Sequence, residues 1–149
     1  MAKITTELTE RPLDPSRAIE DAASDECGAI ASFVGTVRSS ASVPDRAKDR
    51  VLRLEYEAHP TLASEKLTAI AEEAAGKWDL AAVVALHRVG VCDLGEPTVV
   101  VVCAAPHRRE ALEACHWTID EIKRSVPIWK REVYADGTSW VGAEGSNGS

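Results

Sequence analysis

The chain has 149 residues, with 17 lysines and arginines against 24 aspartates and glutamates, so its formal net charge is −7. This length fits one domain with a single core. The acidic balance argues against a nucleic-acid-binding domain, which usually presents a basic face. No segment reaches the roughly 20 apolar residues of a membrane-spanning helix, and the N-terminus has no signal-peptide pattern.

Strands and helices are expected to alternate in the first half of the chain. A strand is predicted over 4–8, and Asp14-Pro15 is typical of an N-cap and first turn that open a helix to about residue 23. An apolar run predicts a strand over 28–38, and alternating residues predict a half-buried strand over 50–57. The polar, proline-containing segment 39–49 between them is expected to be a mobile loop.

The second half carries two longer helices and more strands. Pro60 opens a helix to about residue 77, and a second helix is expected over 107–125. These elements indicate one domain, residues 1–149, of α+β class, with a mixed or antiparallel sheet and two main helices. The remaining expected elements are strands over 82–89, 98–105, 128–134 and 139–141, turns over 92–97 and 135–137, and a frayed tail over 144–149.

The helix over 107–125 has one apolar face. Steps of three and four residues predict that this face is buried and that Lys123 lies at its edge. A lysine in that position either extends over the core with its amine in water or faces a partly dry pocket, and this pattern alone favours the first arrangement. The residues of the face are Leu112, Cys115, Ile119, Ile122 and Val126.

A sharp corner is predicted where this helix ends. Pro127 stops the helix, because the residue before a proline is pushed out of the α region. Lys123 then lies in the last turn and Lys130 on the extended segment that follows, so the two amines can converge on one pocket. The alternative is that cations merely favour a helix C-terminus and that Trp129 simply packs.

Three cationic residues stand at the start of the same helix, where they oppose the helix dipole. His107, Arg108 and Arg109 could bind a phosphate there, or acidic neighbours in the first turns could offset them in solvent. His107 and Lys123 are 16 residues apart, which is roughly 24 Å along a helix. If both helix ends serve one site, two copies of the chain must share it, which predicts a homodimer.

Arg38 is a further candidate because it ends a strand and precedes the polar segment. Gly35 permits a close backbone approach and Thr36 offers a hydroxyl. Binding sites are often assembled where strands run into loops, although an ordinary arginine at a strand end explains the pattern equally well.

Several ordered segments together carry a family resemblance. They are Phe33-Val34-Gly35-Thr36-Val37-Arg38, Leu54-Glu55-Tyr56-Glu57-Ala58, His87-Arg88-Val89-Gly90, Gly95-Glu96, His107-Arg108, and Lys123 followed by Pro127-Ile128-Trp129-Lys130-Arg131-Glu132. In order and spacing, over about residues 28–142, the chain resembles the large, catalytic subunit family of molybdopterin synthase. No single segment is decisive, but the ordered set is specific.

The resemblance implies an α/β-hammerhead fold and a sulfurtransferase activity. Members of that family convert cyclic pyranopterin monophosphate into molybdopterin. The sulfur comes from a thiocarboxylate on the C-terminal Gly-Gly of a small ubiquitin-like subunit. Two large subunits form a central dimer with one small subunit at each end, which implies a heterotetramer. The acidic charge, the thiols and the lack of an apolar span predict a cytoplasmic protein with neither a nucleic-acid nor a membrane partner.

The resemblance also assigns residues. Lys123 and Lys130 correspond to the catalytic pair, one for proton transfer and one for stabilising charge on the acyl intermediate, without showing which does which. It implies no metal ligand and no cofactor. The positions that correspond to substrate-binding residues are Phe33, Thr36, Val37, Arg38, His107, Arg108, Arg131 and Glu132.

The chain departs from the common family pattern at a few positions, which predicts small differences in pocket shape and partner fit. Two other functions stay open: a persulfide sulfurtransferase that uses a cysteine, and a non-catalytic scaffold for the ubiquitin-like partner. The four cysteines lack a CxxC pair and are expected to be reduced thiols. The departures are Ser39-Ser40, Leu62, Leu112 and Arg131, and the cysteines are Cys27, Cys92, Cys103 and Cys115.

Overall fold

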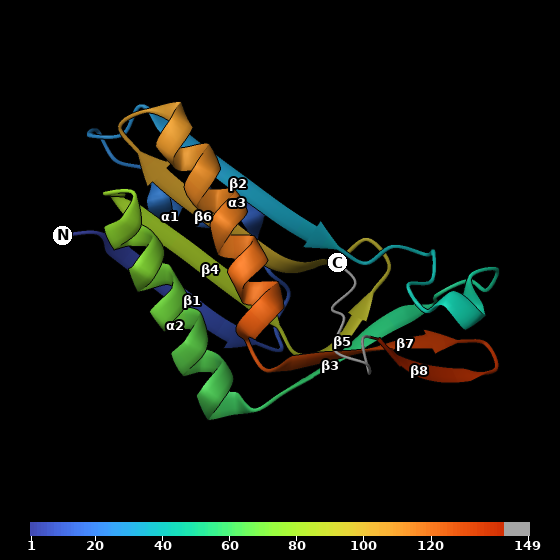
Figure 1. Cartoon of the computed structure of the whole chain (residues 1–149). Coiled ribbons are helices and arrows are strands. Elements are labelled where there is room, and N and C mark those ends of the chain that lie inside the picture. Colours follow the sequence, from blue (N-terminus) through green and yellow to red (C-terminus); the bar gives the residue numbers. More distant parts are fainter. Residues whose placement is uncertain (142–149) are drawn as a thin grey trace.

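The computed structural model describes residues 1–141 and has three α-helices and eight strands in that part of the chain (Figure 1). The expected α+β class is therefore confirmed, but the strands form two sheets rather than one. The elements in chain order are β1 (Lys3–Thr9), α1 (Pro15–Ala22), β2 (Ala29–Thr36), a 3₁₀ helix (Pro44–Arg46), β3 (Arg53–Ala58), α2 (Pro60–Lys77), β4 (Ala82–Arg88), β5 (Gly90–Asp93), β6 (Pro97–Ala105), α3 (Arg108–Ser125), β7 (Ile128–Tyr134) and β8 (Gly137–Val141).

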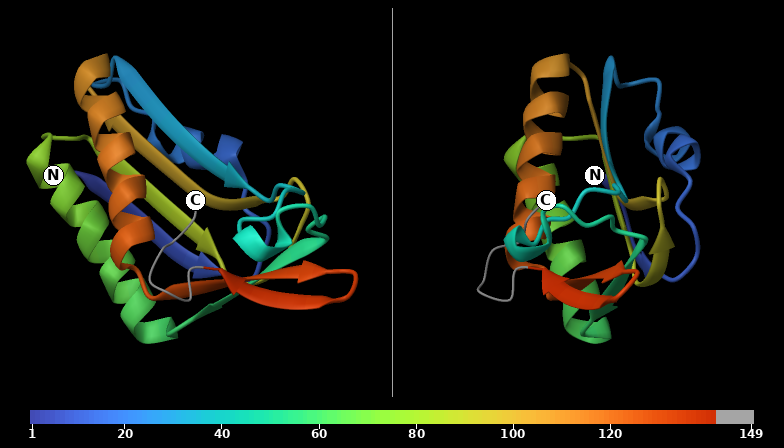
Figure 2. Two further views of the ribbon diagram at one scale, coloured as in Figure 1. Left: turned by 45° about the vertical axis from the view of Figure 1, so that its right-hand side comes forward. Right: turned by 90° about the vertical axis from the view of Figure 1, so that its right-hand side faces the viewer.

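The first sheet has the strand order β1-β4-β6-β2 and is mixed, because β1 and β4 are parallel while the other pairs are antiparallel. Helices α2 and α3 cover one face and α1 covers the other, as the edge-on view in Figure 2 shows. Successive side chains of a strand point to opposite faces. Val99 and Val101 therefore pack under α2 and α3, whereas Val100 and Val102 pack under α1. Burial on both faces explains why β6 is almost uniformly apolar.

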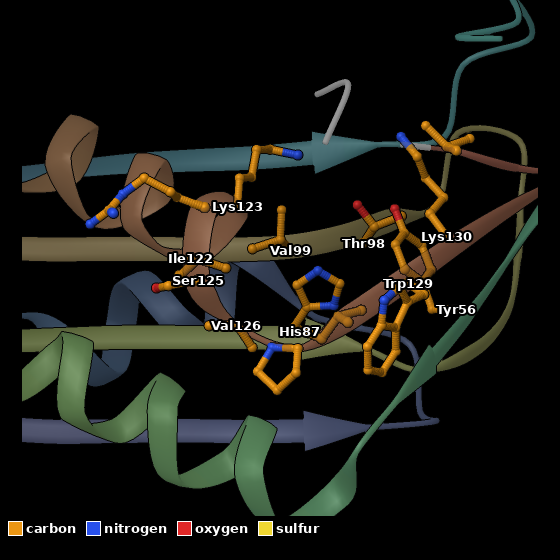
Figure 3. Close-up of a pocket in the computed structure, with 14 residues that line it drawn as sticks. Tyr56, His87, Thr98, Val99, Ile122, Lys123, Ser125, Val126, Trp129 and Lys130 are labelled. Atoms are coloured by element: carbon orange, nitrogen blue, oxygen red, sulfur yellow. The ribbon is translucent and has the colours of Figure 1, made fainter. Parts of the chain in front are cut away.

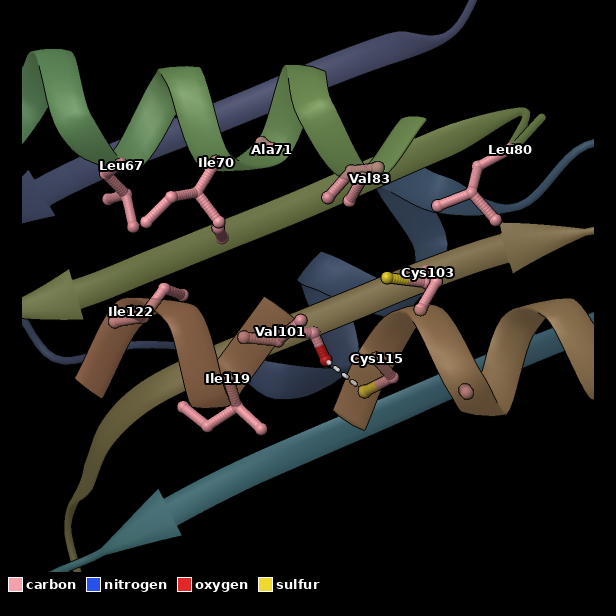
Figure 4. Close-up of a cluster of buried hydrophobic side chains, with 14 of the residues drawn as sticks. Leu67, Ile70, Ala71, Leu80, Val83, Val101, Cys103, Cys115, Ile119 and Ile122 are labelled. Atoms are coloured by element: carbon pink, nitrogen blue, oxygen red, sulfur yellow. Dashed lines mark hydrogen bonds between the residues drawn. The ribbon is translucent and has the colours of Figure 1, made fainter. Parts of the chain in front are cut away.

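The larger core lies between this sheet and the two long helices (Figure 4). Cys115, Ile119 and Ile122 of α3 are buried there, as predicted, but Leu112 is 61% exposed. One residue turns a helix by about 100°, so the buried face begins instead at Ala111. The spacing of three and four residues did not distinguish a buried face that begins at Ala111 from one that begins at Leu112. The small side chains of Ala111 and Ala114 allow α3 to lie close to the sheet.

The second sheet has the order β5-β3-β7-β8 and is antiparallel throughout. It lies beyond the end of the first sheet, where β7 follows α3 directly (Figure 1). Sequence reasoning assigned 92–97 to a turn and missed β5, a strand of only four residues whose last two are Cys92 and Asp93. The expected hairpin between β7 and β8 is present, and Gly137 supplies its positive φ of 147°.

Two further expectations concern the C-terminal tail and membrane-spanning helices. The expected frayed tail, 144–149, lies outside the described residues. Within residues 1–141, no helix combines the length and the apolar character needed to cross a membrane.

Candidate active site

The predicted corner between α3 and β7 is present. The backbone N–H of Val126 donates to the carbonyl of Ile122 over 3.1 Å and closes the helix, and Pro127 then directs the chain into β7. The carbonyl of Pro127 accepts a hydrogen bond of 3.3 Å from the backbone N–H of His59, which anchors the corner to the start of α2. Lys123 lies in the last helical turn and Lys130 on the strand.

A cavity of about 280 Å³, here called the corner cavity, opens beside this turn (Figure 3). Both lysines line it, from opposite sides of a space that Val99 and His87 border (Figure 3). Its remaining wall combines polar and apolar side chains, and most of the apolar ones come from the corner itself. Those wall residues include Ile122, Val126, Pro127, Ile128 and Trp129.

A second cavity of about 320 Å³, here called the loop cavity, lies between the end of β2 and the segment that follows it. Gly35 is required here, because a Cβ at this position would lie 2.8 Å from Cγ1 of Val99. The pairing of β2 with β6 also shifts register between Gly35 and Thr36. The lining includes four predicted substrate-binding residues, Phe33, Thr36, Arg38 and Glu132.

The two cavities share a boundary. Lys123, Lys130, Tyr56 and Thr98 line both of them. Tyr56 and Lys130 are paired neighbours on β3 and β7, so the register of the second sheet places the phenol beside the amine. A group bound in one cavity can therefore meet a group bound in the other at the two lysines.

Burial weakens proton binding by both lysines, and repulsion adds to this effect at Lys130. Burial lowers the pKa of Lys130 to about 8, and the nearby charges of Lys123 and Arg38 act in the same direction, while Glu132 opposes them. Burial also lowers the pKa of Lys123. The favoured expectation that Lys123 extends into water is therefore wrong, because its amine faces a partly enclosed cavity.

Glu132 is 2% exposed, and its carboxylate binds protein groups. It accepts hydrogen bonds from the backbone N–H of Ser42, at 2.9 and 3.1 Å to its two oxygens, and from the hydroxyl of Tyr134 at 2.5 Å. The hydroxyl of Ser42 in turn accepts a bond of 3.2 Å from the guanidinium of Arg38. Glu132 thus fixes the segment that positions Arg38, and contact with a substrate stays a prediction.

The segment 39–49 has defined contacts, although its expected mobility stays a prediction. It contains the 3₁₀ helix and a bridge between Ser40 and Arg50. Arg46 pairs with Asp49 at 2.8 Å and with Asp136, and its guanidinium lies 4.2 Å from the ring centre of Tyr134. The polar composition of this segment predicted a loop, but it could not predict that Arg46 contacts Tyr134 and Asp136.

Four predicted residues lie elsewhere. Val37 is 4% exposed and packs in the core of the second sheet. Arg131 pairs with Glu55 and lines neither cavity. His107 and Arg108 lie at the start of α3, at the opposite end of the helix from Lys123 (Figure 1). One copy of the chain does not bring both helix ends together, as the length of the helix predicts.

Sequence reasoning gave no role to Tyr56, His87 or Thr98, although all three line the corner cavity. The signal available for His87 was a polar side chain that, with Arg88, ends the otherwise apolar run of β4. For Tyr56 it was the strand register, which could not be derived from the sequence.

The cysteines lie outside the two cavities that both lysines line, although Cys115 borders a further cavity with Lys123. All four are free thiols, and Cys92, Cys103 and Cys115 are at most 6% exposed. None lines either cavity. In residues 1–141, no group of three or more histidines, cysteines or carboxylates is placed to hold a metal ion.

Comparison with known proteins decides the family. The family model described as MoaE protein matches residues 8–125. The chain belongs to the MoaE family. It is similar to the molybdopterin synthase catalytic subunit of Bacillus subtilis (strain 168), with 40% identity over 136 residues, which is 91% of this chain and 83% of that protein. The resemblance predicted from the ordered segments is confirmed.

Solved structures of MoaE-like proteins share the fold. The crystal structure of molybdopterin synthase from Staphylococcus aureus superposes with a TM-score of 0.83 and 31% identity, covering 91% of this chain and 96% of that one. A complex of subunits 1 and 2 of molybdopterin-converting factor from Helicobacter pylori contains a chain with the same fold. Its TM-score is 0.70 at 21% identity, with 95% of this chain and 90% of that one covered.

The role of Glu132 in this MoaE chain can be tested by replacing it with glutamine. Glu132→Gln keeps the shape of the side chain but replaces one carboxylate oxygen with an NH₂ group, which would face the N–H of Ser42 or the hydroxyl of Tyr134. Hydrogen bonds to a charged acceptor stabilise a protein by about 1.5–3 kcal/mol. The segment 39–49 should then open about tenfold more often or beyond. Limited trypsin digestion, followed by mass spectrometry at Arg46, Lys48 and Arg50, measures this opening.

Glu57→Gln is the matched control, because Glu57 is exposed on β3 and should leave the cleavage rate unchanged. Equal cleavage of the Glu132→Gln variant and the unmodified protein would show that Glu132 does not hold the segment.

Proposed function

We propose that this chain is the catalytic subunit of a molybdopterin synthase. It would transfer sulfur from the C-terminal thiocarboxylate of a small ubiquitin-like subunit to cyclic pyranopterin monophosphate and so build the dithiolene. The observation that carries the proposal is the position of Lys123 and Lys130 at the boundary of two cavities. Membership of the MoaE family supports the reaction type.

The two cavities suit the two substrates. The loop cavity has Arg38, Thr36 and both lysines in its wall, a set that fits a phosphate and the polar edge of a pterin. The corner cavity has a wall of both apolar and polar side chains and ends at the same lysines, which fits an extended peptide with a negative terminus. The sulfur and its acceptor carbon would meet between Lys123 and Lys130.

Each transfer needs one bond to form and another to break. The thiocarboxylate sulfur bonds to a side-chain carbon of the pterin while a carbon–oxygen bond at that carbon breaks, and the oxygen leaves as water or stays on the opened phosphate ester. The sulfur is then still linked to the acyl carbon of the donor tail. Water then attacks the acyl carbon, the acyl–sulfur bond breaks, and the donor leaves as a carboxylate while the sulfur stays on the pterin. Two donors are consumed for each dithiolene. A base must take the proton from the water, and a cation stabilises the oxyanion.

The lysines can divide these tasks. With a pKa of about 8, roughly a tenth of Lys130 is neutral at pH 7, compared with less than a thousandth of an ordinary lysine. We assign proton transfer to Lys130 on this ground. Lys123, at the C-terminus of α3, would then supply the positive charge that stabilises the acyl intermediate.

A second copy of the chain would complete the site. His107 and Arg108 lie far from the lysines of their own chain, at an end of α3 with free backbone N–H groups, and they suit an anion. We propose that they reach the loop cavity of a partner copy in a homodimer, with one small subunit at each end. The four free thiols are typical of a cytoplasmic protein, and we propose that location.

Reconstitution tests the proposed reaction. The chain is mixed with a thiocarboxylated small subunit and cyclic pyranopterin monophosphate, and the dithiolene product is quantified. The unmodified chain should form product, and Lys123→Ala and Lys130→Ala should each lose about 100-fold or more, in the range expected for lost acid–base or oxyanion catalysis. A folded chain that binds the small subunit but forms no product would favour a scaffold role.

The pH dependence tests the role of Lys130. Because its folded pKa is lowered, the ammonium loses its proton as the pH rises through about 8, and the neutral amine predominates above that value. Turnover at saturating substrates should therefore rise to a plateau above pH 8. Lys130→Arg stays charged and should show low turnover without this rise. The same rise in the arginine variant would assign the base to another group.

Mixed dimers test the shared site. Lys123→Ala and Arg108→Ala damage different halves of a composite site, so a heterodimer keeps one site in which both residues are intact. Random mixing of two inactive variants should therefore restore about a quarter of normal activity. No restoration, with heterodimers demonstrated by mass spectrometry, would place each site within one chain.

A further inference from the structure

His87 is a buried group at the lysine site that the proposed chemistry does not use. It stands near the end of β4 and is 8% exposed. Its ring lies between Lys123 and Lys130 and borders the corner cavity (Figure 3). The ring of Tyr56 packs against it edge to face, with 5.2 Å between the ring centres and an angle of 79°.

One hydrogen bond fixes which ring nitrogen carries the proton. Nδ1 lies 2.7 Å from the backbone carbonyl oxygen of Arg88, and a carbonyl can only accept. Nδ1 must therefore donate, which leaves Nε2 as an acceptor in the neutral ring. Tyr56 restrains the ring from the side, so the acceptor has a fixed direction.

The surroundings keep this ring neutral. Burial lowers the pKa of His87 to about 4; the hydrogen bond to Arg88 opposes this change, and the charges of Lys123 and Lys130 add to it. At neutral pH the corner cavity therefore contains an uncharged acceptor beside two groups that can only donate when protonated.

A hydrogen-bond donor is the natural partner for such a group. Where the apolar side chains of the corner line the cavity, a backbone N–H that enters gives up water and needs an acceptor from the protein. A Gly-Gly tail has no side chains, so its backbone is all that the cavity can recognise. Lys123 and Lys130 would hold the charged end, and an acceptor is needed for the N–H groups behind it.

We propose that Nε2 of His87 accepts a hydrogen bond from a backbone N–H of the C-terminal Gly-Gly tail of the sulfur donor. This inference rests on the proposed function. It makes His87 a substrate-binding residue for the tail and not for the pterin, because His87 lines the corner cavity but not the loop cavity that contains Arg38.

A pair of substitutions separates the two nitrogens. His87→Asn keeps a donor near the Arg88 carbonyl but removes the acceptor that faces the cavity. His87→Gln places an amide oxygen near the position of Nε2 but gives up the bond to Arg88. His116→Asn, at an exposed histidine of α3, is the control. The affinity of each variant for the carboxylate form of the small subunit is measured by titration, and KM for the pterin is measured separately.

Loss of one buried hydrogen bond predicts about tenfold weaker small-subunit binding for His87→Asn, with the KM for the pterin unchanged. His87→Gln should lose about threefold or less, and His116→Asn should not change. Equal losses in both His87 variants would indicate a structural role through Arg88. A raised KM for the pterin alone would assign His87 to that substrate, and no change would exclude it from binding.

The carboxylate form of the small subunit has no sulfur to transfer. The measured affinity of each His87 variant for it therefore does not depend on whether the chain catalyses the proposed reaction. If the unmodified chain binds the small subunit but forms no dithiolene, the proposed function fails while the role of His87 is still measured. Unfolding temperatures of the His87 variants, compared with that of His116→Asn, exclude a general loss of structure.

Discussion

Two amines of like charge share one partly enclosed space because the chain changes from helix to strand at Val126 and Pro127. Lys123 and Lys130 are seven residues apart and lie on elements that run in different directions. This change of direction lets the two side chains enter one space from opposite sides. Desolvation disfavours the charge of both lysines, and the charges of Lys123 and Arg38 add to this effect at Lys130. Two anionic substrates would relieve that cost, so the arrangement suits the two substrates of the proposed function.

The rest of the fold holds this corner in place. The first sheet and the long helices fix the end of α3 through a tightly packed core, and the hydrogen bond from His59 ties the corner to α2. The second sheet then sets the register that puts Tyr56 beside Lys130. On its other side, Glu132 and Ser42 fix the segment that carries Arg38. A helix and a strand thus carry the two lysines, and a loop that is held by hydrogen bonds carries Arg38.

The neutral acceptor and the cationic donors at this site have a common origin. Burial lowers the pKa of His87 as well as that of Lys130, and the charge of Lys123 lowers both of these pKa values further. In His87 the result is an uncharged ring, and in Lys130 it is an amine that loses its proton near neutral pH. Burial in one partly enclosed space therefore favours the neutral form of both side chains, which is the form that the proposed roles require.

The sequence by itself determined the α+β class, most element positions, the corner at Pro127 and the family, because these depend on local signals such as periodicity, proline geometry and ordered motifs. The length of α3 also separated His107 from Lys123 in one copy. Only the tertiary structure decided the two sheets, the exposure of Leu112, the pairing of Glu132 with Ser42 and the position of His87. These features depend on strand register and on contacts between residues as many as 90 positions apart, and no local pattern encodes them.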